Sequence, residues 1–305
     1  MKAVIYYFSG TGNTEKVVKE YVKNLEALGV TVEARKIEAE HVNDKAKNID
    51  LSEFDLLGVA YPIHAFNAPS IVLKFLKKIK KQPKKTRLFI AKTSGEPLRL
   101  NNISSSKVKS ILKHRNFELT NEYHYCMPYN IIFRHSDNMA YKMWNTAVNL
   151  IPLDCFEIVN GKKVKLKYMP FSSVLAWIMR VEHWGGRFNG KHYKVNEKCV
   201  NCQKCVRACP TNNIRIDENG NFHFGKNCLM CMRCSFFCPT DAIKIGFFEK
   251  WKVNGAYNFN NPTETEEEKH KRYCKKSYQK YFARSDAKIK SALKLETDNE
   301  KTTSK

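Results

Sequence analysis

Two cysteine runs constrain this chain more than any other feature. Each run has the spacing C-x2-C-x2-C-x3-C followed by proline, and the runs begin at Cys199 and Cys228. Together they contain eight of the chain's 11 cysteines. A repeat of this kind indicates two copies of one small unit. Three cysteines so close together on a tight loop can direct their sulfurs to one centre, so the spacing favours metal binding over disulfides.

The spacing predicts two [4Fe–4S] clusters whose ligands cross between the runs. In this arrangement the fourth cysteine of each run binds the other cluster. The two predicted ligand sets are Cys199, Cys202, Cys205 with Cys238, and Cys228, Cys231, Cys234 with Cys209. A zinc module is the alternative. Zinc sites usually pair CxxC units across a longer gap and take four ligands, so two sets of three plus one fit zinc badly.

The region around these runs resembles the two-cluster bacterial ferredoxins. The resemblance covers about 50 residues, and its cysteine motif is highly specific. It implies a small α+β domain over residues 195–250. One departure is the position after the second cysteine, often glycine in such proteins, which is Gln203 in the first run and Met232 in the second. This departure affects hydrogen bonding to the cluster sulfurs, not ligation.

The first 125 residues alternate the patterns of buried strands and amphipathic helices. Strands are predicted from apolar runs at 2–8, 30–35, 54–61, 88–92 and 117–125. Helical stripes lie between these runs, for example Val17, Val18, Tyr21, Val22 and Leu25. Alternating βα units imply a parallel sheet covered by helices on both faces. We therefore expect a doubly wound α/β domain.

A hydroxyl-rich loop joins the first predicted strand to the first helix. Its residues are Ser9, Gly10, Thr11, Gly12, Asn13 and Thr14. A phosphate at this position would meet free backbone N–H groups and the positive end of the helix. The loop has no lysine in the P-loop position and lacks the GxGxxG pattern. It therefore suits a phosphate monoester, with FMN as the predicted ligand; a phosphate-free tight turn is the alternative.

This segment resembles the flavodoxins. The resemblance covers residues 1–125 and implies a five-stranded sheet in the order 2-1-3-4-5, with FMN at the switch point between strands 1 and 3. It also implies two loops that flank the flavin ring. Their residues are Tyr61, Pro62, Ile63, His64, Ala65, Phe66 and Asn67 after the third strand, and Thr93, Ser94 and Gly95 after the fourth.

The same resemblance suggests roles within these two loops. Phe66 or Tyr61 is the candidate to stack on the ring. The second loop has no aromatic residue, so one face of the flavin is expected to be open. His64 either stabilises a reduced, anionic flavin or simply faces solvent.

Four regions follow from these patterns. We expect an FMN-binding domain at 1–150, a connecting segment at 151–194, the ferredoxin domain at 195–250 and a charged, partly helical tail at 251–305. The connecting segment matches no motif. Its two tryptophans, Trp177 and Trp184, are expected to pack against both domains because such side chains are rarely solvated.

The charge of the chain is strongly positive. The formal net charge is +23, and between Lys74 and Arg115 we count 14 Lys and Arg against the single acid Glu96. Either these are ordinary solvated helix faces, or they form a surface that attracts redox partners with acidic docking faces or an anionic membrane. Nucleic acid is not expected, because no recognised nucleic-acid module is present. No apolar stretch reaches membrane-spanning length and the N-terminal run reads as a strand, so a cytoplasmic protein is expected.

The order of the two parts resembles the flavodoxin–ferredoxin fusions called EFR-type ferredoxins in anaerobic bacteria. It implies an electron-transfer protein that carries electrons through two [4Fe–4S] clusters and FMN between redox partners. No catalytic acid or base stands out. One alternative is an FMN-dependent reductase of an organic substrate that the clusters supply with electrons. Another is a docking module whose flavodoxin-like half binds no flavin.

Overall fold

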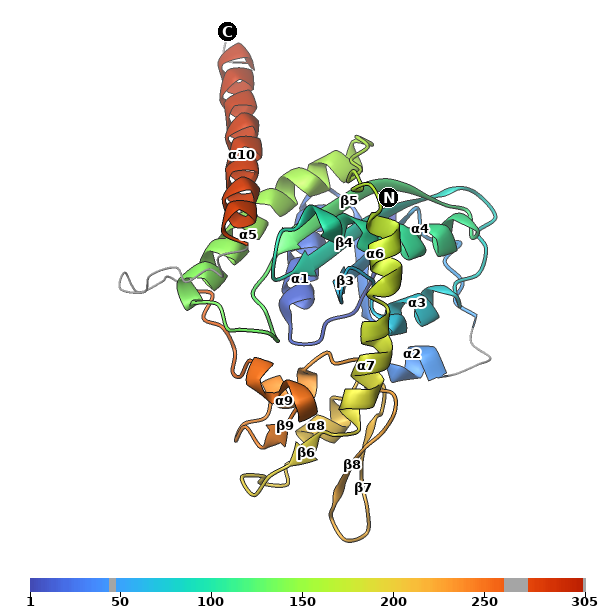
Figure 1. The fold of residues 1–305 in the computed structure, drawn as a ribbon. Helices are drawn as coiled ribbons and strands as arrows, with labels where there is room; N and C mark the ends of the chain where they lie inside the picture. Colours follow the sequence, from blue (N-terminus) through green and yellow to red (C-terminus); the bar gives the residue numbers. More distant parts are fainter. Residues whose placement is uncertain (44–47, 261–273, 304–305) are drawn as a thin grey trace.

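Five parallel strands form the centre of the molecule. The computed structural model describes residues 1–43, 48–260 and 274–303 (Figure 1). The strands are β1 (Lys2–Tyr7), β2 (Thr31–Lys36), β3 (Leu56–Pro62), β4 (Thr86–Ser94) and β5 (Phe117–Cys126). They hydrogen-bond in the order β2-β1-β3-β4-β5, all parallel. This is the strand order of the flavodoxin-like fold, as predicted.

Both faces of this sheet are covered by helices. On one face, α3 (Ser70–Leu76) and α4 (Ser106–Lys113) pack their apolar sides on the strands; α2 (Ala39–Asn43) and the 3-10 helix η1 (Arg99–Ser105) lie beside them. On the other face lie α1 (Asn13–Ala27) and α5 (Asp137–Val159). Burial on both faces explains why β1 and β3 are almost continuously apolar.

Helix α5 extends the flavodoxin-like unit beyond the domain boundary predicted at residue 150. Ile151, Cys155 and Ile158 are fully buried in the core that α5 shares with α1 and the sheet. Val164 then pairs with Asn121 beside β5. The flavodoxin-like unit therefore continues past residue 150. The boundary predicted at residue 150 falls inside this helix, because the sequence pattern weakens there while the helix runs on through Pro152.

The cysteine-rich part is small and lies below the sheet in Figure 1. It contains two two-stranded sheets and two short helices, one per cysteine run, which is the predicted α+β pattern. The strands are β6 (Lys194–Val195) paired with β9 (Ile243–Lys244), and β7 (Ile214–Ile216) paired with β8 (Phe222–Phe224); the helices are α8 (Lys204–Arg207) and α9 (Arg233–Phe236). The 3-10 helix η2 (Gly246–Trp251) follows.

The C-terminal region is more than a charged tail. Helix α10 (Lys275–Thr303) packs on α5 through Tyr278 and Phe282. Its Lys288 ammonium donates to the buried carboxylates of Asp154 (2.6 Å) and Glu157 (2.8 Å). The tail predicted to be partly helical over 251–305 is helical from Lys275 onward, and 261–273 lie outside the described residues. In the described part of the chain, no helix is both long and apolar enough to span a bilayer.

Helices α6 (Ser172–Ile178) and α7 (Val181–Gly190) lie end to end along one side of the molecule (Figure 1). They lie in the chain between the flavodoxin-like unit and the cysteine-rich part. The expectation for their tryptophans was wrong, because Trp177 is 66% exposed and Trp184 is 71% exposed. It was based on residue type alone, whereas the residues these helices bury are the small ones.

Candidate functional site

The predicted FMN loops surround one cavity of about 420 Å³ at the carboxyl ends of the strands. Of the predicted FMN residues, all except Gly12, Tyr61 and Asn67 line it. The cavity is closed by α7, by η2 and by the segment 127–132 after β5. It therefore lies between the flavodoxin-like unit and the cysteine-rich part.

The loop between β1 and α1 forms the polar end of this cavity. The hydroxyl-bearing residues Ser9, Thr11 and Thr14 are at most 9% exposed. The Thr14 hydroxyl lies 2.8 Å from that of Thr93, so the first loop is tied to the end of β4. The amide of Asn130 donates to the Thr11 hydroxyl (3.3 Å). These buried donors, at the start of a 15-residue helix, suit an anionic group.

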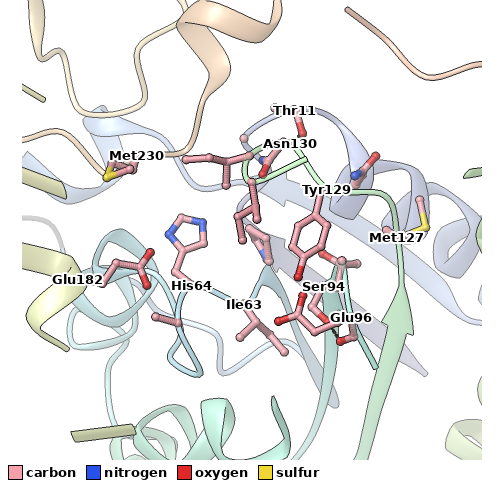
Figure 2. A pocket seen from close by; sticks show the side chains of 18 of the residues that line it. Thr11, Ile63, His64, Ser94, Glu96, Met127, Tyr129, Asn130, Glu182 and Met230 are labelled. Carbon is pink, nitrogen blue, oxygen red and sulfur yellow. Dashed lines mark hydrogen bonds between the residues drawn. The ribbon is translucent and has the colours of Figure 1, made fainter. Parts of the chain in front are cut away.

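An aromatic residue that sequence analysis missed stands beside the second loop. A Cβ placed on Gly95 would lie 2.4 Å from the ring of Tyr129, so only glycine allows this contact. Figure 2 shows Tyr129 beside Glu96 and Ser94, across the cavity from His64. The aromatic group that the second loop lacks thus comes from the segment after β5. No motif marked that segment in the sequence.

Three predicted FMN residues are placed away from the cavity. The Tyr61 side chain is fully buried in the core on the α3 and α4 face of the sheet, so it cannot stack on a ring in the cavity. The Asn67 amide instead donates to the carbonyl of Ala176 (2.9 Å), and Gly12 caps α1. Phe66 does line the cavity and remains the candidate from this loop.

Burial shifts the pKa values of three ionisable side chains in the cavity toward their neutral forms. Burial raises the pKa of Glu96 to about 7, and one of its carboxyl oxygens has no hydrogen-bond partner among the described residues. Burial likewise raises the pKa of Glu182 to about 7. Burial, aided by nearby His183, lowers the pKa of His64 to about 4. His64 is therefore neutral at pH 7, which does not favour a role as a positive charge beside an anionic flavin.

The second predicted ligand set lines a single small pocket. Cys209, Cys228, Cys231 and Cys234 all contribute to it, with Tyr193 and Ile214 among the apolar residues around them. Burial raises the pKa of Cys228 to about 12 and that of Cys231 to about 11. Thiols buried in this way ionise when a metal centre supplies the positive charge. The four sulfurs are thus suited to a cluster.

The first predicted ligand set lies closer to solvent. Cys199, Cys202 and Cys205 are partly exposed, and Val200 beside them is 62% exposed. Cys205 and Cys238 pack against the same apolar group around Ile243. Among the described residues no three His, Cys, Asp or Glu side chains are close enough to share a single metal ion.

The phosphate-type loop and the second cysteine run are in direct contact. A Cβ on Gly10 would lie 2.3 Å from the backbone oxygen of Cys231. Arg233 donates to the carbonyls of Ser9 (2.6 Å) and Gly10 (3.2 Å) and to both carboxylate oxygens of Glu38 (3.0 Å each). The two candidate cofactor sites are therefore adjacent, and the hydrogen bonds of Arg233 fix their relative position.

Met230 spans this junction. It lies between Cys228 and Cys231 in sequence and lines both the pocket of the second ligand set and the large cavity. Figure 2 shows its sulfur at the edge of the cavity, on the side of His64 and Glu182. Met230 therefore borders both candidate cofactor sites.

Comparison with known proteins supports the iron–sulfur part. Residues 198–242 match the family model described as a 4Fe-4S dicluster domain. One curated relative, pyruvate synthase subunit PorD of Methanocaldococcus jannaschii, is 59% identical over 27 residues, which are 9% of this chain and 31% of that protein. The chain therefore matches less than a third of that relative's length.

Solved structures similar to this chain include several flavodoxins. The flavodoxin of Streptococcus pneumonia TIGR4 is 13% identical and covers 52% of this chain and 99% of its own, with a TM-score of 0.38. Flavodoxin 1 of Bacillus cereus is 13% identical over 52% of this chain and 98% of its own (TM-score 0.37). The fold class is defined by the strand order, not by these likenesses.

Proposed function

We propose that this protein is an electron-transfer protein that binds two [4Fe–4S] clusters and FMN and passes electrons between them. The observation that carries the proposal is the contact of Gly10 with Cys231, which brings a phosphate-type loop against a cluster-binding loop. Clusters pass one electron at a time, whereas FMN takes one or two. Adjacent sites therefore form a short electron path in which FMN can connect one-electron and two-electron transfer.

The residues around the large cavity fit FMN. Ser9, Thr11 and Thr14, with the amino end of α1, would hold its phosphate. Phe66 and Tyr129 are available to contact the ring, and the unpartnered carboxyl oxygen of Glu96 is available for a hydrogen bond to its polar edge. These groups bind and orient the cofactor and exclude water from it.

The difference in exposure suggests an order for the two clusters. The first ligand set lies near solvent, whereas Cys231 of the second set is buried against the flavodoxin-like unit. We place electron exchange with external partners at the first set and exchange with the flavin at the second. Partners with acidic docking faces fit the basic charge of the chain.

The cofactor content tests this proposal. Protein prepared without oxygen should contain about eight iron atoms and eight sulfides per chain, together with one FMN. A reduced protein donor should bleach the flavin absorbance. Protein with this iron content that neither contains nor takes up FMN would overturn the electron path and leave the docking-module alternative.

A second candidate is an FMN-dependent reductase of an organic molecule. The observation that favours it is the pair Glu96 and Glu182, which face the cavity with pKa values near 7 and so suit proton donation at neutral pH. Steady-state turnover of a small organic acceptor that is lost in Glu96→Gln or Glu182→Gln would favour this function. If flavin reduction is unchanged in the same variants, the lost turnover reflects chemistry on the organic substrate and not a loss of electron transfer to the flavin.

A further inference from the structure

Helices α6 and α7 expose large apolar side chains and bury small ones. Their buried residues are Ser172, Ala176, Gly186, Asn189 and Gly190. The large apolar side chains that are more than half exposed, in these helices and at Phe171 directly before α6, are Phe171 (86%), Trp184 (71%), Trp177 (66%), Val181 (64%), Phe188 (59%), Val174 (54%) and Ile178 (52%). A helix that packs on a core has the reverse pattern. We call the exposed set, Phe171 to Phe188, the apolar stripe.

The apolar stripe is continuous along the helix pair. Trp177 and Ile178 are adjacent, and each member lies three or four residues from another member, the spacing that places side chains on one face of a helix. At its end the Phe188 ring stacks on Phe247, with centroids 6.0 Å apart and planes 2° from parallel. Phe247 is itself 66% exposed. Large exposed apolar patches of this kind mark interaction surfaces.

The inner side of the helix pair is fixed to the domain. The carbonyl of Ala176 accepts from the Asn67 amide (2.9 Å), and Arg180 donates to the oxygen of the same Asn67 (3.4 Å). Met179 and Glu182 line the large cavity. Because these contacts fix the inner side of the helix pair, the stripe faces outward from the protein.

Positive charge surrounds the apolar stripe. Residues 160–195 contain eight Lys and Arg and one acid, Glu182, which lines the cavity. Lys165 and Lys167 are exposed just before the stripe, and Lys191 just after it. Lys162 and Lys163, further upstream, are exposed but paired with the carboxylates of Glu157 (2.8 Å) and Glu118 (3.0 Å). Lys107 of the basic 74–115 region lies close to Arg180 and Lys77, and burial together with the positive charges of these two neighbours lowers its pKa. Cations therefore lie at both ends of the stripe and beside it.

We propose that the apolar stripe docks this protein on an anionic membrane surface, with α6 and α7 lying in the plane of the interface. Tryptophan rings are favoured at the boundary between headgroups and acyl chains, and lysines beside an amphipathic helix are attracted to acidic lipids. A second copy of the chain is a poorer occupant, because its own cations would face those of the first. The proposal does not depend on FMN or on the clusters.

Docking in this way would orient the electron path. The opposite side of α7 lines the large cavity through Glu182, Gly185 and Gly186. One helix, about 10 Å in diameter with its side chains, thus lies between the proposed membrane face and the cavity. The partly exposed first cysteine run stays available to a partner in solution.

Vesicle flotation with the full-length holoprotein tests the proposal. The probes are phosphatidylcholine vesicles with and without a phosphatidylglycerol fraction. We expect at least tenfold stronger binding to the anionic vesicles and a marked loss of binding in high salt. The variant Trp177→Ser with Trp184→Ser should bind at least tenfold more weakly, and Lys165→Glu with Lys167→Glu should lose most of the preference for anionic lipid.

The matched control is Phe156→Ser, which removes a large side chain that is 59% exposed on α5 and outside the stripe. It should bind vesicles like the parent protein. All variants replace exposed side chains, so their iron and flavin contents should stay at the parent values. Equal flotation of the double-tryptophan variant and the parent would overturn the proposal. Absence of binding to either kind of vesicle would also overturn the proposal, whether or not the stripe forms a dimer in solution.

Discussion

At the scale of single residues, Arg233 joins the two halves of the molecule. It is 7% exposed and donates to three backbone carbonyls and to Glu38. In sequence it lies directly between the buried Met232 and the predicted ligand Cys234. A planar guanidinium with five donors can satisfy all of these acceptors from one position, which lysine cannot do.

Replacement of Arg233 should therefore loosen the junction. Arg233→Met leaves the carbonyls and the Glu38 carboxylate without their donor, so we expect a loss of about 3 kcal/mol in stability and at least tenfold slower flavin reduction by a reduced protein donor. Thermal unfolding and stopped-flow absorbance measure the two effects. Arg215→Met, at an exposed position on β7, is the control. Equal rates in both variants would show that Arg233 does not hold the path together.

Glu96 gives the molecule a pH dependence. Its folded pKa of about 7 lies above the ordinary value of 4.5. Between these values the folded chain keeps a proton that the unfolded chain releases, so stability falls as the pH rises from about 4.5 to 7. The loss is complete above pH 7 and amounts to about 3 kcal/mol.

The variant Glu96→Gln should remove this dependence and raise the unfolding temperature at pH 8 more than at pH 5. Thermal unfolding of both proteins across this pH range is the measurement. Glu26→Gln, at an exposed position on α1, should leave the slope unchanged. A parallel pair of curves for Glu96→Gln and the parent would show that Glu96 is not buried in the state that unfolds.

At the scale of elements, α10 holds the loop after β4, which lines the candidate flavin site. The Tyr278 hydroxyl donates to the carbonyl of Gly95 (2.5 Å) and lies 3.0 Å from His135 Nε2. The Tyr281 hydroxyl accepts from the backbone N–H of Cys126 at the end of β5 (3.1 Å). The helix thereby fixes the loop after β4, against which Tyr129 packs.

Removal of one of these bonds should weaken cofactor retention without unfolding the helix. Tyr278→Phe keeps the buried ring and loses a hydrogen bond worth about 1 kcal/mol, so we expect FMN to dissociate about fivefold faster. The rise in flavin fluorescence after dilution reports this rate. Gln279→Ala, on the exposed side of α10, should release FMN at the parent rate. A faster release from Gln279→Ala as well would attribute the effect to helix stability.

The elements also show what the sequence could and could not predict. The alternation of strands and helices and the loop after the first strand were predictable because βα periodicity and a glycine-rich turn are local patterns. The strand order and the two loops expected beside the flavin ring followed from the resemblance to the flavodoxins. Tyr129 and Tyr278 were missed, since each reaches the site through contacts with residues distant in sequence. Trp177 was expected to be buried from its type, but burial depends on which face of a helix meets the core.

At the scale of the whole molecule, the two cysteine runs have different environments in spite of their repeated sequence. The first run borders solvent, and the second packs against the loop at Gly10. The two runs thus share one sequence pattern but occupy different positions in the molecule. An electron from a partner would meet the first cluster site and leave the second toward the cavity.

This asymmetry can be tested with one ligand from each set. Cys202→Ala and Cys231→Ala should each lower the iron content from about eight to about four per chain, because each removes one ligand of a different cluster. Cys155→Ala, a buried thiol in the core beside α1, should keep all of the iron. Iron analysis and flavin absorbance are measured on the same oxygen-free samples.

The rates then give the direction of the path. If electrons enter at the first cluster, a reduced protein donor should bleach the flavin at least tenfold more slowly in both Cys202→Ala and Cys231→Ala, since either loss interrupts a series connection. Normal bleaching in Cys202→Ala alone would mean that the donor reaches the second cluster directly. Normal bleaching in Cys231→Ala would refute the proposed contact at Gly10 as the electron path, because that contact involves only the second run.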